Sequence, residues 1–271
     1  MSLGSNLRSI RKERKLTQEA VAYEIGVSFQ AVSSWERDEY MPDTENLIRL
    51  AELYGVTVSS LVEKKKHMFN TKDAVYNWEH MKTYVKTTAK SLKLKNTLEA
   101  LDFAVEAHKG QKRKKSEVPY IYHPLNLACH ALAMNILEDE VIAACLLHDV
   151  IEDCGVEVED LPVNEETCEL VVLLTHAKTT DEDRDKVMRK YYRAIAANPR
   201  AALIKCLDRC NNLTTMAWGL SREKIFRMIN ETELYYPELL RVLKKTPEYN
   251  DAAWLLQYQM ESTLDIYKRL M

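Results

Sequence analysis

The chain has 271 residues and a formal net charge of −3, and 46% of its residues are apolar while 29% are charged. These values exclude a largely disordered protein, allow roughly two domains and predict no general attraction to nucleic acid. The apolar run from Val141 to Leu147 is far shorter than the roughly 18 residues of a membrane span, and the N-terminus lacks the apolar middle of a signal peptide. We therefore expect a cytoplasmic protein with no membrane partner.

The sequence predicts an all-α fold. Its six glycines are widely spaced, and between them apolar residues recur at helical spacing, with no alternating stretch longer than about five residues. None of the six cysteines forms a CxxC pair, so we interpret them as reduced thiols rather than as a zinc or redox site.

Residues 1–66 divide into five short predicted helices. These helices span residues 4–14, 18–25, 28–37, 44–53 and 58–62. Thr17 is placed to cap the second helix, and Asp43 begins the fourth. The stretch "LTQEAVAYEIGVSFQAVSSWERD" gives a helix, a tight turn at Gly26 and a second helix.

This pattern, followed by "MPDTENLIRLAELYGVTVSSLV", resembles the helix-turn-helix domain of the Cro/C1-type repressor family. The resemblance implies double-stranded DNA as a partner, with "SFQAVSSWER" as the recognition helix in the major groove. It also implies which side chains meet the DNA. The base-facing residues are Phe29, Gln30, Ser33 and Ser34, and the phosphate-holding residues are Gln18 and Arg37.

The charge of this segment tempers the expectation of DNA binding. Residues 1–66 carry ten Lys or Arg and ten Asp or Glu, so attraction to phosphate has to be local. A basic run from Arg8 to Lys15 could supply it, or could be a solvated face. Asp38 stands where the family usually has glycine, and with Glu39 it would face the DNA backbone unfavourably. The alternative is a module that serves only for dimerisation.

Residues 67–95 are predicted to be a helical linker, because Trp78, Met81 and Val85 keep a helical stripe. A second domain is predicted over residues 96–271. It begins with "NTLEALDFAVEAHKG", whose first four residues have the register of a capping box and whose last glycine ends the helix.

The segment "EDEVIAACLLHDVIEDC" places ionisable side chains in an apolar helical stretch. On a helix, His148 and Glu152 lie one turn apart, as do Asp149 and Asp153, so all four head groups can emerge near one helix end. A solvated helix end is the plain interpretation. The alternative is a metal site, because a buried charge needs a partner or an ion.

Two further segments favour the metal site. "PYIYHP" contains His123, and "AALIKCLDRCNNLTTM" contains Asp208 and Asn212 one helical turn apart. A histidine, a histidine–aspartate pair and a distant aspartate form a mixed nitrogen and oxygen ligand set. Such a set suits Mn²⁺, Fe²⁺ or Zn²⁺ rather than a thiolate centre.

Four ordered motifs resemble the hydrolase domain of RelA/SpoT-type enzymes, which are HD-type metal-dependent phosphohydrolases: "AHKGQKRKK" with the following "PYIYHP", then "LLHDVIED", "LLTHAK" and "IKCLDRCNNL". The resemblance runs from residue 97 to residue 240. It implies a multi-helix domain that hydrolyses the guanine nucleotide alarmone (p)ppGpp and releases pyrophosphate from its 3′ position.

The same resemblance implies roles for individual residues and Mn²⁺ as the cofactor. The implied metal ligands are His123, His148, Asp149 and Asp208. Glu152 and Asp153 match the acidic pair that positions and activates the attacking water. The implied substrate-binding residues are Arg113, Lys114, Asn212 and Thr215.

Departures from the family pattern leave alternatives open. The loop after Lys114 is one residue longer than the common pattern, and Ser116 falls where glycine is frequent, which bears on nucleotide specificity. Asn211 replaces a commonly seen histidine. The alternatives are hydrolysis of another phosphorylated nucleotide, or a transcription regulator that the nucleotide controls with little or no turnover. The sequence is compatible with a homodimer.

Overall fold

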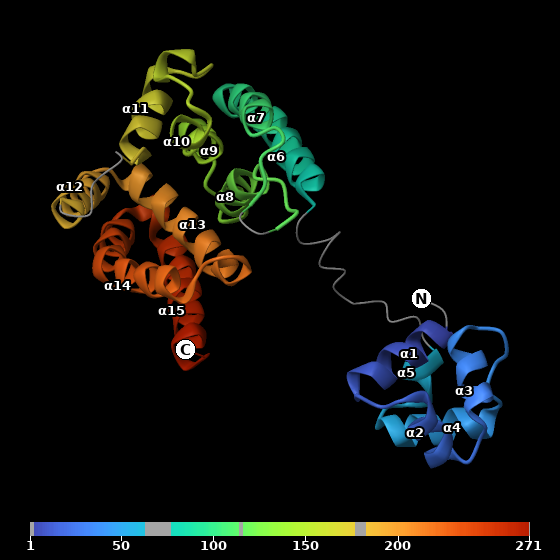
Figure 1. Cartoon of the computed structure of the whole chain (residues 1–271). Helices are drawn as coiled ribbons and strands as arrows, with labels where there is room; N and C mark the ends of the chain where they lie inside the picture. The colour runs from blue at the N-terminus through green and yellow to red at the C-terminus, as the bar shows by residue number, and fades with distance from the viewer. Residues whose placement is uncertain (1–2, 63–76, 114–115, 177–182, 271) are drawn as a thin grey trace. The chain divides into compact units, whose positions relative to one another are not determined.

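The computed structural model describes residues 3–62, 77–113, 116–176 and 183–270. The chain forms two compact units, Met1–Val75 and Tyr76–Met271, each of which is described by itself (Figure 1). Within the described ranges the regular elements are all helices, apart from an isolated bridge between Lys112 and Pro119, which confirms the predicted all-α fold. No helix in these ranges is both long enough and apolar enough to cross a membrane.

The N-terminal unit contains five helices within its described part. They are α1 (Leu3–Glu13), α2 (Gln18–Ile25), α3 (Phe29–Glu36), α4 (Thr44–Tyr54) and α5 (Val58–Val62). Thr17, Ser28 and Asp43 each cap a helix by accepting a hydrogen bond from the backbone N–H three residues on. Gly26 ends α2 with φ of 72°, a left-handed conformation that glycine adopts without strain. These local signals explain why the predicted boundaries agree with the observed ones within one residue.

A buried ion pair ties α1 to α3. Arg11 Nε lies 2.6 Å from Glu36 Oε1, and Arg11 Nη2 donates to Glu36 Oε2 at 2.9 Å. The same Oε2 atom accepts a hydrogen bond from Gln18 Nε2 at 2.7 Å. Burial favours the neutral form of Glu36, but the hydrogen bonds from Arg11 and Gln18 outweigh burial and lower the pKa of the carboxyl group.

Asp38 has a structural role that its sequence position did not reveal. Its φ is 58°, so aspartate here adopts the left-handed conformation in which the family usually has glycine. Its Oδ1 accepts a hydrogen bond of 2.7 Å from the backbone N–H of Gly4, in the first turn of α1. The neighbouring Glu39 forms an ion pair with Arg37 at 2.8 Å. Both acidic side chains that we expected to oppose DNA are therefore engaged within the unit.

Substituting Gly4 is expected to destabilise the N-terminal unit. A Cβ atom on Gly4 would lie 2.2 Å from the backbone oxygen of Trp35, so α1 and α3 would have to move apart. Such overpacking costs about 1–3 kcal/mol, which corresponds to roughly 5- to 150-fold faster exchange of amide hydrogens. Hydrogen exchange of α3 in Gly4→Ala measures this, with the exposed α2 position Glu24→Ala as control. Equal exchange in both variants would contradict the close approach.

The C-terminal unit is larger. Its α-helices are α6 (Trp78–Leu92), α7 (Lys95–Ala107), α8 (Tyr122–Ala133), α9 (Asp139–Leu147), α10 (Val150–Cys154), α11 (Glu165–Leu174), α12 (Arg184–Ala196), α13 (Pro199–Thr215), α14 (Arg222–Lys245) and α15 (Asn250–Leu270). Short 3₁₀ turns are η1 (Val158–Asp160), η2 (Met216–Trp218) and η3 (Pro247–Tyr249). Helix α6 lies in the predicted linker 67–95 and packs against α7 and α8.

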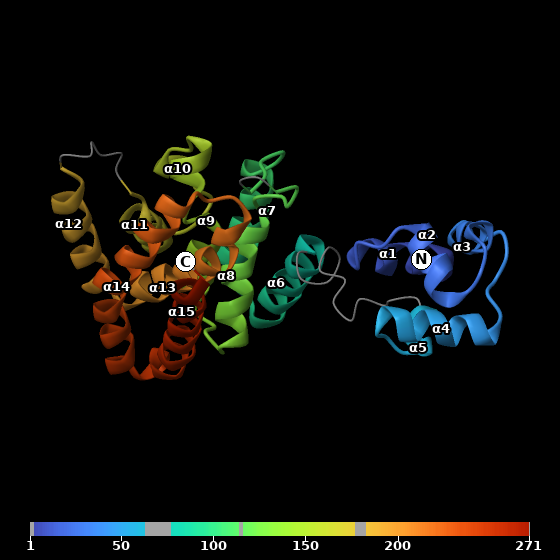
Figure 2. The same cartoon turned by 60° about the horizontal axis from the view of Figure 1, so that its bottom comes forward.

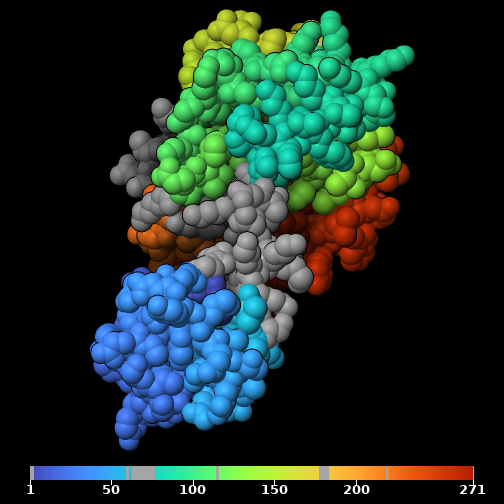
Figure 3. Space-filling model, turned by 90° about the vertical axis from the view of Figure 1, so that its right-hand side faces the viewer, coloured from blue at the N-terminus to red at the C-terminus, as the bar shows by residue number. Residues whose placement is uncertain are grey.

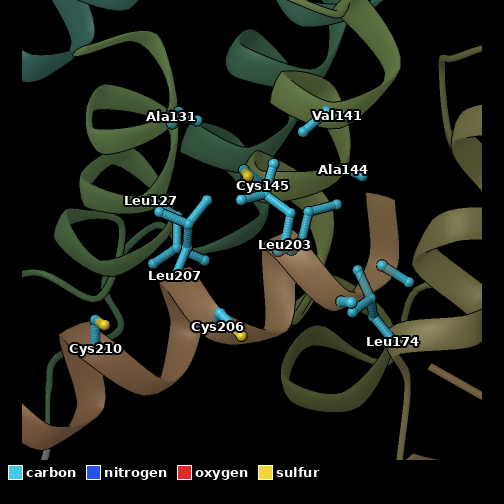
Figure 4. Packing of buried hydrophobic residues seen from close by; sticks show 14 of the residues in the cluster. Leu127, Ala131, Val141, Ala144, Cys145, Leu174, Leu203, Cys206, Leu207 and Cys210 are labelled. Carbon is cyan, nitrogen blue, oxygen red and sulfur yellow. The ribbon is translucent and has the colours of Figure 1, made fainter. Parts of the chain in front are cut away.

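Helix α13 is the centre of this unit (Figure 2). It contacts α8, α9, α11, α12, α14 and α15. Its buried side chains Leu203 and Leu207 face residues of α8 and α9, such as Leu127 and Cys145 (Figure 4). Because α13 is surrounded on most sides, polar groups along it have to find partners within the protein.

Arg209 fixes α13 on the side of α12 and α14. It is 7% exposed, and its guanidinium group lies over the ring of Tyr236, with 4.8 Å from Cζ to the ring centroid. It donates to Tyr192 Oη at 3.2 Å and to the backbone oxygen of Met228 at 3.3 Å, and it lies 3.5 Å from Glu231 Oε2. This buried arginine is thus paired and stacked at several points.

The predicted start of the second domain needs a correction. Helix α7 begins at Lys95, and its N-terminus has no local side-chain cap, so the expected capping box is wrong. The carboxylate of Asp139 accepts hydrogen bonds from the backbone N–H groups of Asn96 and Thr97 at 2.8 and 2.7 Å. The cap therefore comes from α9, far along the chain.

Residues 78–107, drawn in teal, cover part of one face of this unit (Figure 3).

Candidate functional site

The helix that carries His148 and Asp149 is broken at these residues. Helix α9 ends at Leu147 and α10 begins at Val150, so the single helix expected through this segment is wrong. Helix α9 is apolar all round, with Val141 to Leu147 fully buried. His148 and Asp149 emerge where it ends, and His148 Nε2 lies 3.1 Å from Asp149 Oδ2. The break lets two consecutive side chains point at the same place.

His123 and Asp208 converge on the same point from other helices. His123, near the start of α8, brings its Nε2 to 3.2 Å from His148 Nε2 and 3.4 Å from Asp149 Oδ2. Asp208, on α13, places Oδ1 3.3 Å from His123 Nε2. His123, His148 and Asp149 together satisfy the spacing of a metal site. The structure therefore brings together all four residues that the sequence suggested as ligands.

The outer atoms of both imidazoles have partners. His123 Nδ1 lies 2.6 Å from Asn211 Oδ1, whose amide nitrogen in turn donates to Asn126 Oδ1 at 2.8 Å. His148 Nδ1 lies 2.9 Å from the backbone oxygen of Cys145. Because an oxygen acceptor lies at Nδ1 of each ring, Nε2 is the atom that faces the carboxylates, and it can ligate a metal once it has lost its proton.

Electrostatics of the cluster favour positive charge at its centre. Burial lowers the pKa of His123, but hydrogen bonds to Asp149 and Asp208 outweigh burial and raise it to about 9. Burial raises the pKa of Asp208, but the charge of Lys205 and the hydrogen bond with His123 depress it well below its usual range. Two ionised carboxylates facing imidazole nitrogens are a donor set that a divalent cation fits, with release of a proton.

The two acidic residues after the break lie differently. Asp153 lines a cavity beside the cluster. Glu152 is one turn along from His148, and its Oε1 accepts a hydrogen bond from the backbone N–H of His176, in the "LLTHAK" motif. Loss of hydration raises the pKa of Glu152, and the negative charge of Asp149 raises it further.

The cavity has a volume of about 560 Å³. Arg113 Nη2 donates hydrogen bonds to Asn212 Oδ1 at 3.1 Å and to Thr215 Oγ1 at 3.0 Å. These three residues, all suggested as substrate-binding, line the cavity together, while Lys114 lies outside the described residues. The other lining residues are Gln111, Lys112, Tyr120, Asp153, Met216, Gly219, Leu220 and Met228.

Two cavity residues also touch the ligand cluster. Tyr120 Oη donates to Asp149 Oδ2 at 2.7 Å, and Asn212 Nδ2 donates to Asp208 Oδ1. The Arg113 guanidinium group lies over the Tyr120 ring, with 5.5 Å from Cζ to the ring centroid. The cavity therefore adjoins the cluster, with cationic and apolar walls that suit a phosphorylated, ring-containing ligand.

Sequence reasoning missed three residues of this site. Tyr120 belongs to the aromatic stretch before His123, but the sequence did not predict its contact with Asp149. Asn211 was noted only as a replacement for histidine, although it holds His123. Lys205, whose Nζ lies 3.0 Å from Asp208 Oδ2, was not singled out. Its three-residue spacing from Asp208 on one helix was the available signal.

The residues suggested as base-facing lie on α3. Phe29, which is 40% exposed, and Gln30 lie exposed at the start of the helix. Ser33 and Ser34 are half-buried, and Ser34 Oγ donates to the backbone oxygen of Ala31 at 2.9 Å. Phe29 and Gln30 thus offer the apolar and amide groups that can meet base edges.

The two residues suggested as phosphate-holding already have protein partners. Gln18 donates its amide to Glu36, as described above. Arg37 donates two hydrogen bonds to the Glu39 carboxylate, each 2.8 Å, and a further one to Ser33 Oγ. Both would have to exchange these partners to bind a DNA phosphate.

Comparisons with known proteins agree with this division. Residues 7–61 match the family model described as helix-turn-helix, and residues 100–239 match the model described as HD domain. Over 145 residues, 51% of this chain, it is 37% identical to a guanosine-3′,5′-bis(diphosphate) 3′-pyrophosphohydrolase of Aquifex aeolicus. Over 171 residues, 60% of this chain, it is 34% identical to the bifunctional (p)ppGpp synthase/hydrolase SpoT of Escherichia coli.

These matches cover only part of the relatives, 20% of the Aquifex protein and 24% of the Escherichia coli protein. A solved structure described as "A metazoan ortholog of SpoT hydrolyzes ppGpp and plays a role in starvation responses" is similar with a TM-score of 0.51 and 24% sequence identity. The similarity covers 64% of this chain and 96% of that one. At this identity it supports the fold.

Proposed function

Because this chain belongs to the HD domain family, whose model matches residues 100–239, we propose that it is a metal-dependent phosphohydrolase acting on guanosine 3′,5′-bis(diphosphate). The reaction is release of pyrophosphate from the 3′ position. The observation that carries the proposal is the cavity of Arg113, Asn212 and Thr215, which adjoins the cluster of two imidazoles and two carboxylates. Relatives named for this activity are similar over the same region.

The proposed ion is a divalent cation, Mn²⁺, which would be held by His123, His148, Asp149 and Asp208. Such an ion would lower the pKa of a bound water so that the water can attack near neutral pH. Glu152, whose pKa is raised, would accept a proton from the attacking water, and Asp153 would orient that water from the cavity wall. The water oxygen would bond to the phosphorus attached to O3′ as the bond from this phosphorus to O3′ breaks. The proton that Glu152 takes from the water would balance the one that O3′ gains.

The cavity holds the nucleotide in this proposal. Arg113 can donate two parallel hydrogen bonds to a phosphate group, which an ammonium group cannot do. Asn212 and Thr215 bind the nucleoside portion, and the apolar side chains of Met216 and Leu220 exclude water around it. The test is chromatography of ppGpp after incubation of the purified protein with Mn²⁺ or with chelator. Untouched ppGpp beside hydrolysis of another phosphorylated nucleotide would overturn the substrate assignment.

We further propose that the N-terminal unit binds double-stranded DNA, as a homodimer, in the cytoplasm. The match of residues 7–61 to the helix-turn-helix family and the exposed Phe29 and Gln30 support DNA binding. The two-fold arrangement follows from the usual pairing of such units on two half-sites. All six cysteines are free thiols, which accords with a reducing compartment.

Replacing Gln30 is expected to weaken binding to a preferred DNA sequence. An amide that reads an adenine bidentately contributes about 1–3 kcal/mol, so Gln30→Ala should lose roughly 5- to 150-fold in affinity and discriminate less at that base. The operator is first selected from random duplexes, and affinities are then measured at fixed salt. Glu52→Ala, an exposed change on α4, is the control. Equal loss for every sequence would contradict base readout.

A further inference from the structure

A half-buried ammonium group, that of Lys205, contacts one of the four suggested ligands. Lys205 Nζ lies 3.0 Å from Asp208 Oδ2, and the lysine side chain is 17% exposed. It also lies 5.6 Å from the ring centroid of Tyr191, on α12. The other oxygen of Asp208, Oδ1, faces His123 and accepts a hydrogen bond from the Asn212 amide. The two carboxylate oxygens thus have different partners: Oδ2 contacts the Lys205 ammonium group, and Oδ1 contacts His123 and the Asn212 amide.

A positively charged side chain beside a site for a metal cation is unfavourable, so the position of Lys205 requires a physical reason. Asp149 and Asp208 supply two negative charges, which balance one divalent cation held with two neutral imidazoles. Lys205 adds a positive charge to this set of four ligands and ion, whose own charges already balance; the carboxylates of Glu152 and Asp153 lie outside the set. Like charges a few ångströms apart in a partly desolvated site repel, so Lys205 weakens binding of the ion.

Orientation alone does not explain Lys205. The Asn212 amide already fixes Asp208 Oδ1, and a neutral donor on Oδ2 would complete the orientation without repelling an ion. What a neutral donor cannot supply is charge. A diphosphate substrate and a departing pyrophosphate both carry several negative charges, which an additional positive charge in a preorganised site stabilises.

We propose that Lys205 sets the charge of the centre, lowering its affinity for the divalent cation while strengthening its action on an anionic diphosphate. The second half of this inference rests on the proposed function, and the first half does not. Lys205 touches a ligand rather than the substrate, so it is a positioning residue that acts through charge.

The test compares Lys205→Gln, which can still donate to Asp208 but is neutral, with Lys205→Arg, which keeps the charge. Lys190→Gln, on the exposed face of α12, is the matched control. Mn²⁺ affinity is measured on the full chain without nucleotide, by electron paramagnetic resonance of free Mn²⁺. We expect Lys205→Gln to bind Mn²⁺ roughly tenfold more tightly and to lose roughly tenfold or more in kcat. Lys205→Arg should keep a Mn²⁺ affinity and a kcat near those of wild type.

The direction of the change in Mn²⁺ affinity distinguishes a charge role of Lys205 from an orienting role. Weaker Mn²⁺ binding by Lys205→Gln, with an unchanged melting temperature, would overturn the charge role in favour of simple orientation. An unchanged kcat would overturn the catalytic half. Should Lys205→Gln fail to fold, Lys205→Met provides a second neutral variant. If wild type leaves ppGpp intact, the proposed function fails, whereas the Mn²⁺ comparison still decides the charge role.

Discussion

The Asp149→Ala variant is expected to lose hydrolysis of ppGpp by about a thousandfold or more and to lose tight Mn²⁺ binding. Asp149 Oδ2 lies within 3.4 Å of both imidazole nitrogens, whereas Asp208 contacts only His123 of the two, so the variant loses the carboxylate that both histidines share. A cation-activated water contributes several kcal/mol, and about 4 kcal/mol corresponds to a thousandfold in rate. Chromatography of ppGpp, together with Mn²⁺ titration of each variant, measures both losses.

The control for this variant is Glu159→Ala, an exposed carboxylate on η1. It should retain wild-type turnover and Mn²⁺ affinity. Wild type with chelator should reproduce the Asp149→Ala result, because both lack the ion. Full turnover by Asp149→Ala, or by wild type in chelator, would end the metal-dependent interpretation.

Arg113→Ala is expected to lower kcat/KM for ppGpp by about 10- to 150-fold. A hydrogen bond to a charged group contributes about 1.5–3 kcal/mol, which corresponds to this range. The loss should appear mainly in KM if Arg113 holds the nucleotide equally in the ground and transition states. Arg113→Lys should recover only part of it, because an ammonium group cannot fork onto phosphate or stack on Tyr120.

Arg241→Ala, an exposed position on α14, is the matched control and should leave kcat/KM unchanged. Mn²⁺ affinity should stay at the wild-type level in Arg113→Ala, since Arg113 bonds to Asn212 and Thr215 rather than to a suggested ligand. Loss of Mn²⁺ binding in this variant would show that Arg113 supports the cluster instead of the substrate.

The helices of the N-terminal unit could be predicted closely because their starts depend on neighbours in sequence. Thr17 and Asp43 cap helices through contacts three residues away, which a sequence displays directly. The four suggested ligands followed from the resemblance to a known family, together with a ligand set of mixed nitrogen and oxygen atoms in the sequence. The break of the helix at His148 and Asp149 could not be predicted, since an apolar helix continuing through these residues fits the same periodicity.

Contacts between distant segments could not be predicted. The cap of α7 comes from Asp139, more than forty residues along the chain, so the local capping box at Asn96 was a plausible but wrong alternative. Asn211 acquires its role only when α8 and α13 pack together and bring His123 to it. A single sequence records the residues but not which helices meet.

Arg209, enclosed by aromatic rings and hydrogen bonds beside Asp208 in the chain, has a consequence for motion during turnover. Sliding or rotating α13 would separate this guanidinium group from Tyr192 and Tyr236. The charge of Arg209 would then be buried without its partners, at a cost of several kcal/mol. Helix α13 is therefore expected to keep its position during turnover. In the proposed reaction, entry of nucleotide and departure of products would have to occur without movement of α13.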